Sequence, residues 1–450
     1  MMDSATLRDR LREIVTPRTG SVRLKPDATP SGGVSPVASG FSTAVASAEA
    51  VSRTEPNQVR TDPDLERTLG GEWRDACFIV EGRVDPGARY GRGLVGDFAA
   101  RMNAAADGAP FIASGAPARL PLLFFDLETT GLSGGAGTHA FLIGCGWFDD
   151  GGGFVTRQYL LAKFAGERAL LTSVAGEFGR AGALVSFNGK SFDAPVLETR
   201  YLFHRLEWRG AHLPHVDVLH PARRFWKEDE CSLMALERQV LGATRTGDVS
   251  GFEIPERYFR FVRTGDAQPL AAVLEHNRLD LLSLAGLTAR LLDLIRGGPD
   301  QVDNAREALA LGYVYARGRD EVRAVGAYER AATLSAAARG HGAGLIRIDA
   351  LRGLALAYRR ARRYDDAAAC WTALLGAGCQ ANVEREALQA LAIHHEHRAR
   401  NLASAKAFAL RNLTHMQSQP CPAWLRAAQQ RLARIERKMS AYESTGRLLD

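Results

Sequence analysis

The clearest alternation of hydrophobic and polar positions lies at residues 122–131, which read Leu-Leu-Phe-Phe-Asp-Leu-Glu-Thr-Thr-Gly. Successive side chains of a strand point to opposite faces, so this pattern predicts a buried strand with Asp126 and Glu128 on one face. Two neighbouring carboxylates repel each other and are costly to desolvate, and a hard cation such as Mg²⁺ or Mn²⁺ relieves that conflict. Two solvated acids at a strand end remain the alternative for this motif alone.

The hydrophobic pattern around this strand predicts an α/β domain. Short runs of apolar residues predict further strands at 77–81, 140–148, 154–161, 183–187 and 215–218. Amphipathic segments predict helices at about 96–102, 167–180, 194–206 and 233–241, whereas residues 254–266 contain loop signals. Three strands joined by hairpins, followed by helix, strand and helix, predict a mixed sheet flanked by helices.

A long helix is predicted at about 269–295, and it carries a second group of polar residues. His276 and Asp280 are four residues apart and therefore lie on one helix face, one turn apart. The core stripe with Leu281 lies on the opposite side. Taken by themselves, His276 and Asp280 are better explained by an exposed ion pair than by a buried site.

The two ends of the chain differ from this central region. Residues 1–15 read as a short charged helix, and residues 16–65 are rich in Pro, Ser, Gly, Ala and Thr, which predicts disorder. Residues from about 301 are nearly all helical by composition and contain an internal repeat. The repeated positions are Leu311, Gly312, Tyr315, Ala324, Tyr328 and Ala331; Leu354, Ala355, Tyr358, Ala367 and Trp371; and, more weakly, Leu391, Ala392, His395, Ser404 and Phe408.

These repeated aromatic residues are interpreted as core, with small residues that let paired helices approach closely. Residues 423–439 are predicted to form a capping helix with four exposed arginines, namely Arg426, Arg431, Arg434 and Arg437. Such a solenoid has a concave groove that suits a protein segment or a nucleic-acid backbone.

Composition narrows the class of protein. With 46% hydrophobic and 24% charged residues, the chain of 450 residues is typical of soluble globular proteins. No apolar run approaches the roughly 18 residues that span a bilayer, so a cytoplasmic location is expected. Six cysteines are scattered without a C-x-x-C pair, which argues against a structural zinc site and a disulfide framework.

Charge is distributed unevenly along the chain. The net charge is +6, but residues 301–450 hold 23 Lys and Arg against 14 Asp and Glu. This excess fits contact with a phosphate backbone, and it fits equally a protein that uses Arg as its ordinary surface cation. The run Arg223-Arg224-Phe225-Trp226 either stacks on single-stranded nucleic acid or, as we slightly prefer, begins a packed helix.

Three motifs stand in chain order on the expected elements. They are Asp126-Leu127-Glu128-Thr129-Thr130-Gly131, Asn188-Gly189-Lys190-Ser191-Phe192-Asp193 and His276-Asn277-Arg278-Leu279-Asp280. Together they resemble the three motifs of the DEDD exonuclease superfamily, which has a ribonuclease H-like fold. The histidine is four residues before the last Asp, a departure from the usual spacing of five.

This spacing, with the segments Ile-Pro-Glu-Arg-Tyr and Arg-Thr-Gly-Asp that precede it, is similar to the bacterial YprB-type exonucleases. The resemblance implies a ribonuclease H-like exonuclease domain at 66–298 and a tetratricopeptide-repeat domain at 301–440. It leaves residues 1–65 unexplained.

The resemblance also implies a chemistry. Asp126, Glu128, Asp193 and Asp280 would bind two Mg²⁺ or Mn²⁺ ions about 3.5–4 Å apart, which clamp the scissile phosphate. His276 would act as the catalytic base, since histidine has an ordinary pKa near 6.5.

The resulting hypothesis is a metal-dependent 3′→5′ exonuclease that acts on DNA, with a single-stranded 3′ end as substrate, in DNA repair. A helicase or another protein partner would bind through the repeats. The alternatives are a ribonuclease of the same mechanism and a non-catalytic repeat adaptor that docks nucleic acid. The motifs do not distinguish DNA from RNA.

Overall fold

The computed structural model describes residues 63–105, 118–131, 137–226, 230–338, 340–418 and 422–446. The helix expected at 1–15 and most of the disordered segment expected at 16–65 lie outside these ranges. The prediction of disorder is wrong for the last residues of that segment, because helix α3 (Pro63–Leu69) begins at Pro63. Proline suits the first helical position, and Leu65 is buried, so this short helix is anchored in the core.

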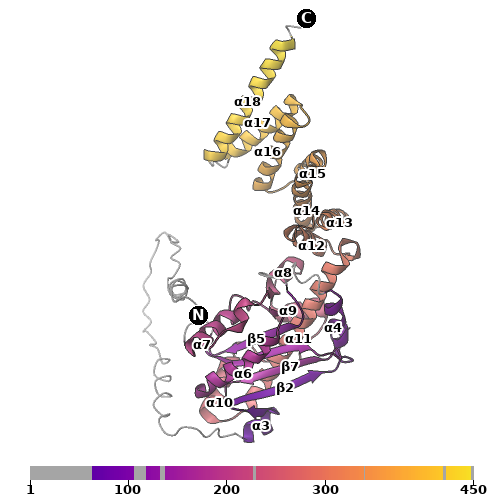
Figure 1. The fold of residues 1–450 in the computed structure, drawn as a ribbon. Coiled ribbons are helices and arrows are strands. Elements are labelled where there is room, and N and C mark those ends of the chain that lie inside the picture. The colour runs from indigo at the N-terminus through magenta and orange to yellow at the C-terminus, as the bar shows by residue number, and fades with distance from the viewer. Residues whose placement is uncertain are drawn as a thin grey trace, which may run out of the picture. The chain divides into compact units, whose positions relative to one another are not determined.

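A seven-stranded mixed sheet forms the centre of the first part of the chain (Figure 1). Its strands in spatial order are β1 (Glu72–Arg74), β2 (Cys77–Val84), β7 (Phe154–Leu160), β6 (Ala140–Phe148), β5 (Leu122–Thr129), β8 (Ala183–Ser186) and β9 (His215–Asp217). β5, β8 and β9 are parallel, whereas the pairs from β1 to β5 are antiparallel. β3 (Arg89–Tyr90) and β4 (Gly93–Leu94) form a separate ribbon. The predicted mixed sheet is confirmed.

Helices cover both faces of the sheet because its strands are apolar on both faces. Phe124 packs in one buried cluster, with α4 (Val95–Ala104), α8 (Leu219–Phe225) and the C-terminal half of α11 (Gln268–Gly297). Phe125 packs in a second cluster, with α6 (Glu167–Arg180), α7 (Asp193–Phe203) and α10 (Ile254–Thr264). The alternation of two adjacent phenylalanines thus divides the core into two layers.

Two predicted segments differ from expectation. The loop signals at 254–266 are overridden by helix α10, whose Tyr258 and Phe261 are buried in the second cluster. The helix expected at 233–241 is present, but only α9 (Leu233–Leu236) is α-helical and Glu237–Leu241 forms a π-helical turn. Such turns occur often at functional sites.

Seven further α-helices follow α11 in the described part of the chain. They are α12 (Ala305–Arg317), α13 (Glu321–Ala337), α14 (His341–Arg360), α15 (Tyr364–Gly376), α16 (Ala381–His397), α17 (Leu402–Ser418) and α18 (Pro422–Gly446). Each packs against the next one along the chain. The predicted helical C-terminal region is therefore confirmed, and none of the described helices is long and apolar enough to cross a membrane.

The turns within the helix pairs repeat one conformation. Arg319, Arg362 and Arg400 have left-handed φ values of 61°, 61° and 52°. In the first two turns the next residue donates its N–H to the carbonyl of Tyr315 or Tyr358, and the third turn is one residue longer. The first two hairpins therefore share one turn, as an internal repeat predicts, and the third differs from them by one residue.

The repeated aromatic side chains lie in the core, as predicted. A Cβ on Gly312 or on Gly353 would come within 2.4 Å or 2.7 Å of the Tyr328 ring, so glycine is needed for the close approach of these helices. The first buried cluster also continues from α11 into α12, α13 and α14. The Tyr315 hydroxyl donates a 2.6 Å hydrogen bond to the Ile295 carbonyl. Packing is therefore continuous across residues 298–301, where the boundary between the two domains is expected.

The last helix corrects one prediction. Arg426 and Arg437 are exposed, but Arg431 and Arg434 pair with Glu396, which is buried on α16. Burial of an unpaired carboxylate is costly, so this acid recruits two arginines that the sequence pattern assigns to solvent.

Candidate active site

Asp126 and Glu128 lie at the C-terminal end of β5, on the face that continues from Leu122 and Phe124. Both acids are partly buried, whereas Leu127 between them is buried in the opposite layer. The predicted shared face is confirmed. The Asp126 carboxylate accepts a 2.9 Å hydrogen bond from Asn277 Nδ2 of α11, so the strand acid and the helix are joined directly.

Asp193 begins α7, after the loop that follows β8. In that loop Asn188 has a φ of 65°, and a Cβ on Gly189 would come within 2.6 Å of Asp193 Oδ2. Asp217 of β9 accepts hydrogen bonds from the backbone N–H groups of Asn188 (2.8 Å) and Lys190 (3.1 Å). Because β5 and β8 are adjacent and parallel, the loop opens at the same edge of the sheet as Asp126.

His276 and Asp280 lie one turn apart on α11, as predicted. His276 Nε2 is 3.5 Å from Asp280 Oδ2, and the two side chains are only 11% and 16% exposed. The alternative of an exposed surface ion pair is therefore wrong. Both side chains face the interior of the domain and are held by partners from other elements.

Electrostatics connects the four acids. Burial raises the pKa of Asp126 well above its ordinary value, and the charges of Asp280, Glu128 and Asp193 raise it further. Glu128 behaves in the same way, through burial and the charges of Asp280, Asp193 and Asp248. Burial, with the charge of Asp217, raises the pKa of Asp193 to about 7. The predicted acids therefore lie close enough for their negative charges to interact unfavourably.

A divalent cation would relieve this field, and the donor set suits one. Carboxylate oxygens are the preferred ligands of Mg²⁺ and Mn²⁺, and repulsion among the four acids is the penalty that such a cation removes. Among the described residues, no three His, Cys, Asp or Glu side chains are already close enough to form a metal-binding group. The donors therefore fit a divalent cation by their chemistry, and their charges act on one another.

Asp280 has a further partner, Arg245, which the sequence analysis missed. Arg245 Nη2 lies 2.6 Å from Asp280 Oδ1 and 2.7 Å from Glu237 of the π-helical turn. Burial raises the pKa of Asp280, against the opposing charges of His276 and Arg245.

The sequence analysis also did not single out Asn277, Asp248 and Asp217. Asn277 is adjacent to His276, and Asp217 ends a predicted strand, so both had a local signal. Asp248 and Arg245 lie in a loop between helices, and only tertiary contact brings them to α11.

Two other candidate features lie outside this group. Phe225 and Trp226 are buried, and the Trp226 indole donates a 2.8 Å hydrogen bond to Glu307. They are not available to stack on bases, so the interpretation of this run as packed is correct, but the run ends helix α8 and does not begin a helix.

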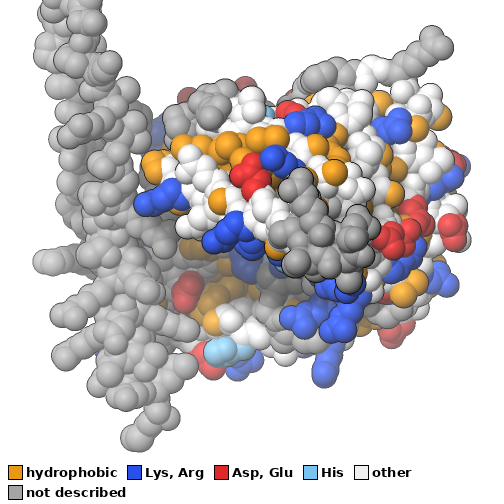
Figure 2. Space-filling view, turned by 90° about the horizontal axis from the view of Figure 1, so that it is seen from above, with side chains coloured by type: hydrophobic (Ala, Val, Ile, Leu, Met, Phe, Trp, Pro, Cys, Tyr) orange, Lys and Arg blue, Asp and Glu red, His pale blue; other side chains and the backbone are white. Residues whose placement is uncertain are grey.

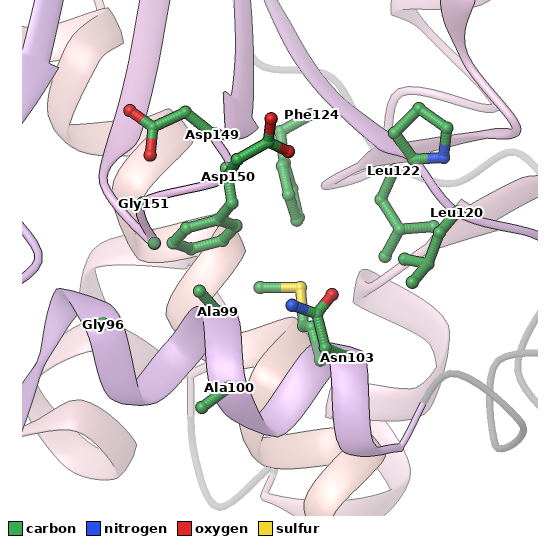
Figure 3. A pocket seen from close by; sticks show the side chains of 14 residues that line it. Gly96, Ala99, Ala100, Asn103, Leu120, Leu122, Phe124, Asp149, Asp150 and Gly151 are labelled. Carbon is green, nitrogen blue, oxygen red and sulfur yellow. The ribbon is translucent and has the colours of Figure 1, made fainter.

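A cavity of about 500 Å³ lies at the opposite end of β5 (Figure 3). Its lining includes Leu120, Leu122, Phe148 and Asp150. Leu122 precedes Glu128 by six strand residues, about 20 Å along the strand. None of the four acids is among the residues that line this cavity, although Phe124, two strand residues before Asp126, is.

The chain was compared with known proteins. Residues 123–292 match the sequence model of the RNase_H superfamily. All five predicted site residues lie in this range, as does the whole sheet edge at which the acids meet.

A curated relative is the uncharacterized protein YprB of Bacillus subtilis (strain 168). It is 34% identical over 259 residues, which make up 56% of this chain and 60% of the relative. The chain thus matches less than two thirds of the relative's length. The family match and this likeness together support an RNase H-like protein.

Proposed function

We propose that the protein is a metal-dependent 3′→5′ exonuclease that hydrolyses phosphodiester bonds of DNA. The observation that carries this proposal is the set of carboxylates from three separate elements, Asp126 and Glu128 on β5, Asp193 on α7 and Asp280 on α11. Asp193 is buried and the other three are partly buried, and burial together with the charges of the group raises the pKa of Asp126 and Glu128. A structural role does not require acids to be gathered in this way, whereas two-cation phosphodiester hydrolysis does.

In this proposal the four acids hold two Mg²⁺ or Mn²⁺ ions, which supply positive charge to the scissile phosphate. The chain's own residues orient the carboxylates and transfer protons. Asn277 holds one oxygen of Asp126, so the other oxygen is free to face a ligand. His276, buried beside Asp280, accepts a proton from the attacking water.

The predicted substrate is a single-stranded 3′ end, and the predicted setting is DNA repair in the cytoplasm. On the face shown in Figure 2, Lys and Arg side chains occur in several groups that alternate with hydrophobic and acidic side chains. Such a mixed surface fits a nucleic acid held at several points. A helicase or another protein bound to the helical repeats is the proposed partner.

The test is an assay with the full chain and matched DNA and RNA oligonucleotides, each labelled at the 3′ or the 5′ end. We expect shortening of DNA from the 3′ end with Mg²⁺ or Mn²⁺, and none with EDTA. Asp126→Ala and Asp193→Ala should each abolish it. Arg426→Ala, an exposed position in α18, is the control and should retain the wild-type rate.

The outcomes separate the alternatives. Shortening of RNA alone identifies a ribonuclease with the same site. Binding without any cleavage identifies an adaptor and contradicts the proposed enzyme, as would full activity of the Asp126→Ala variant.

A further inference from the structure

The loop between the π-helical turn and α10 places an acid against the proposed catalytic histidine. Asp248 Oδ1 lies 2.7 Å from His276 Nδ1, and the two side chains are 12% and 11% exposed. Asp248 comes from a different element than His276, 28 residues away along the chain. This is a hydrogen bond of normal length inside the domain, so it fixes one nitrogen of the imidazole ring.

The protonation of that nitrogen follows from its partner. Asp248 also pairs with Arg245 at 3.1 Å, and although burial would raise the pKa of Asp248, its partners His276 and Arg245 lower it. A deprotonated carboxylate only accepts hydrogen bonds. Nδ1 of His276 must therefore carry the hydrogen, which leaves Nε2 as the basic nitrogen of the neutral ring. Nε2 is the nitrogen that faces Asp280.

Arg245 prevents Asp248 from turning away. Its Nη1 lies 3.1 Å from Asp248 Oδ2, its Nη2 lies 2.6 Å from Asp280 Oδ1, and its side chain is 5% exposed. Its Nε donates a 2.9 Å hydrogen bond to Glu237, which also accepts a 2.5 Å hydrogen bond from Ser283. The Arg245 guanidinium therefore binds both acids that flank the imidazole ring, Asp248 and Asp280.

We propose that Asp248 is a positioning residue that fixes the tautomer and the ring plane of His276, so that Nε2 accepts the proton in the hydrolysis. This inference rests on the proposed exonuclease function. Nε2 takes one proton from the attacking water, and Nδ1 keeps its own, so the ring becomes an imidazolium held by the Asp248 carboxylate. The hydroxide forms the new P–O bond, the bond to the 3′ oxygen breaks, and that oxygen takes a proton from bulk water.

The tautomer is measured directly by NMR on the full chain labelled with ¹⁵N-histidine, without added metal, at a pH where the ring is neutral. The His276→Gln variant identifies the signal of His276. The wild-type ring should be protonated at Nδ1. In Asp248→Asn, Arg245 requires an acceptor and takes the amide oxygen, so the NH₂ group is turned toward Nδ1 and the tautomer should reverse to Nε2–H.

The chain offers a matched control for this variant. Arg263-Thr264-Gly265-Asp266 has the same sequence as Arg245-Thr246-Gly247-Asp248, and Asp266 pairs with Arg260 at the surface. The Asp266→Asn variant should leave the His276 signal unchanged. An Nε2–H ring in the wild type, or no reversal in Asp248→Asn, would overturn the proposal.

Kinetics gives the second measurement. Asp248→Asn should lower kcat by roughly 10- to 100-fold with little change in KM, the loss expected when the partner that orients a functional side chain is removed. In a His276→Ala background the same substitution should have no further effect, because Asp248 acts through His276. An equal loss in both backgrounds contradicts the positioning role. If the wild type cleaves neither DNA nor RNA, the proposed function fails, while the tautomer measurement still decides the orientation.

Discussion

Asn277 Nδ2 donates a 2.9 Å hydrogen bond to Asp126 Oδ2, and Asn277 Oδ1 accepts one of the same length from Gln158 Nε2 of β7. Asn277 is fully buried and Gln158 nearly so. Side-chain hydrogen bonds inside the domain therefore connect Gln158 of β7, Asn277 of α11 and Asp126 of β5. Such a chain orients Asp126 only while every member is satisfied.

The first prediction concerns this donor. Asn277→Asp keeps the shape of the side chain but replaces the donor with a second carboxylate beside Asp126. We expect nuclease activity to fall at least about 100-fold and unfolding free energy to fall by roughly 1–3 kcal/mol, the cost of an unsatisfied buried group. Activity assays and thermal denaturation measure both. Asn304→Asp is the control, because aspartate is as good as asparagine at the N-terminus of a helix such as α12.

Gly144 of β6 provides a second test of the same contact. A Cβ at this position would lie 2.1 Å from Asn277 Oδ1, so Gly144→Ala must displace the asparagine. We expect a loss of activity together with a loss of stability. Gly176→Ala in α6 is the control, since nothing lies within 4 Å of its added Cβ and alanine favours a helix. Unchanged activity in Gly144→Ala would show that Asn277 does not orient Asp126.

The raised pKa of Asp193 predicts a dependence of stability on pH. Its folded-state pKa is about 7 against an ordinary 3.8, so the folded protein binds this proton more tightly than the unfolded chain does. Stability without added metal should therefore fall as pH rises from about 4 to 7. Asp193→Asn removes that penalty and should raise the unfolding free energy at pH 8 by up to about 4 kcal/mol, although it abolishes activity.

Urea denaturation without metal measures this effect. At pH 4 the stabilisation should nearly vanish, because Asp193 is then protonated in the folded wild-type protein. Addition of Mg²⁺ or Mn²⁺ at pH 8 should stabilise the wild type more than the variant. A variant that is less stable than the wild type at pH 8 would contradict the assignment.

Glu167 predicts the opposite dependence. Burial would raise its pKa, but hydrogen bonds from His139, Arg200 and His204 outweigh burial and lower it to about 2. The stability that this acid contributes is present above its ordinary value of 4.5 and is lost as pH falls toward 2. Because His139 pairs with Thr130 directly after the β5 acids, this network also anchors the end of that strand.

Glu167→Gln should lower the unfolding free energy at pH 7 by roughly 3–5 kcal/mol, since it removes the charge of a buried carboxylate that pairs with the buried Arg200. The difference from wild type should shrink toward pH 2. Glu253→Gln removes an exposed pair with Arg257 and should change stability by less than about 1 kcal/mol. Equal losses for the two variants would argue against a special role of Glu167.

Much of the fold was predictable because the buried faces of helices and strands require apolar residues at regular intervals in the local sequence. The bounds of α6 were predicted to the residue, and β6 likewise, since both are amphipathic or apolar throughout. Helix α10 was not predicted, because its glycine- and proline-flanked sequence resembles a loop until Tyr258 and Phe261 pack into the core. Arg431 and Arg434 were misplaced for the same reason, since only tertiary contact brings them to Glu396.

The sequence by itself determined the mixed sheet, the helical C-terminal region and which acids share a face of one strand or helix, because residue type and spacing act over a few neighbours. It paired Asp126 with Glu128 by strand alternation and His276 with Asp280 by helical periodicity. Only the tertiary structure brought Asn277 to Asp126, Asp248 to His276 and Arg245 to Asp280. These contacts join residues 28 to 151 positions apart along the chain, and no local pattern encodes them, since they form only when the core brings separate elements together.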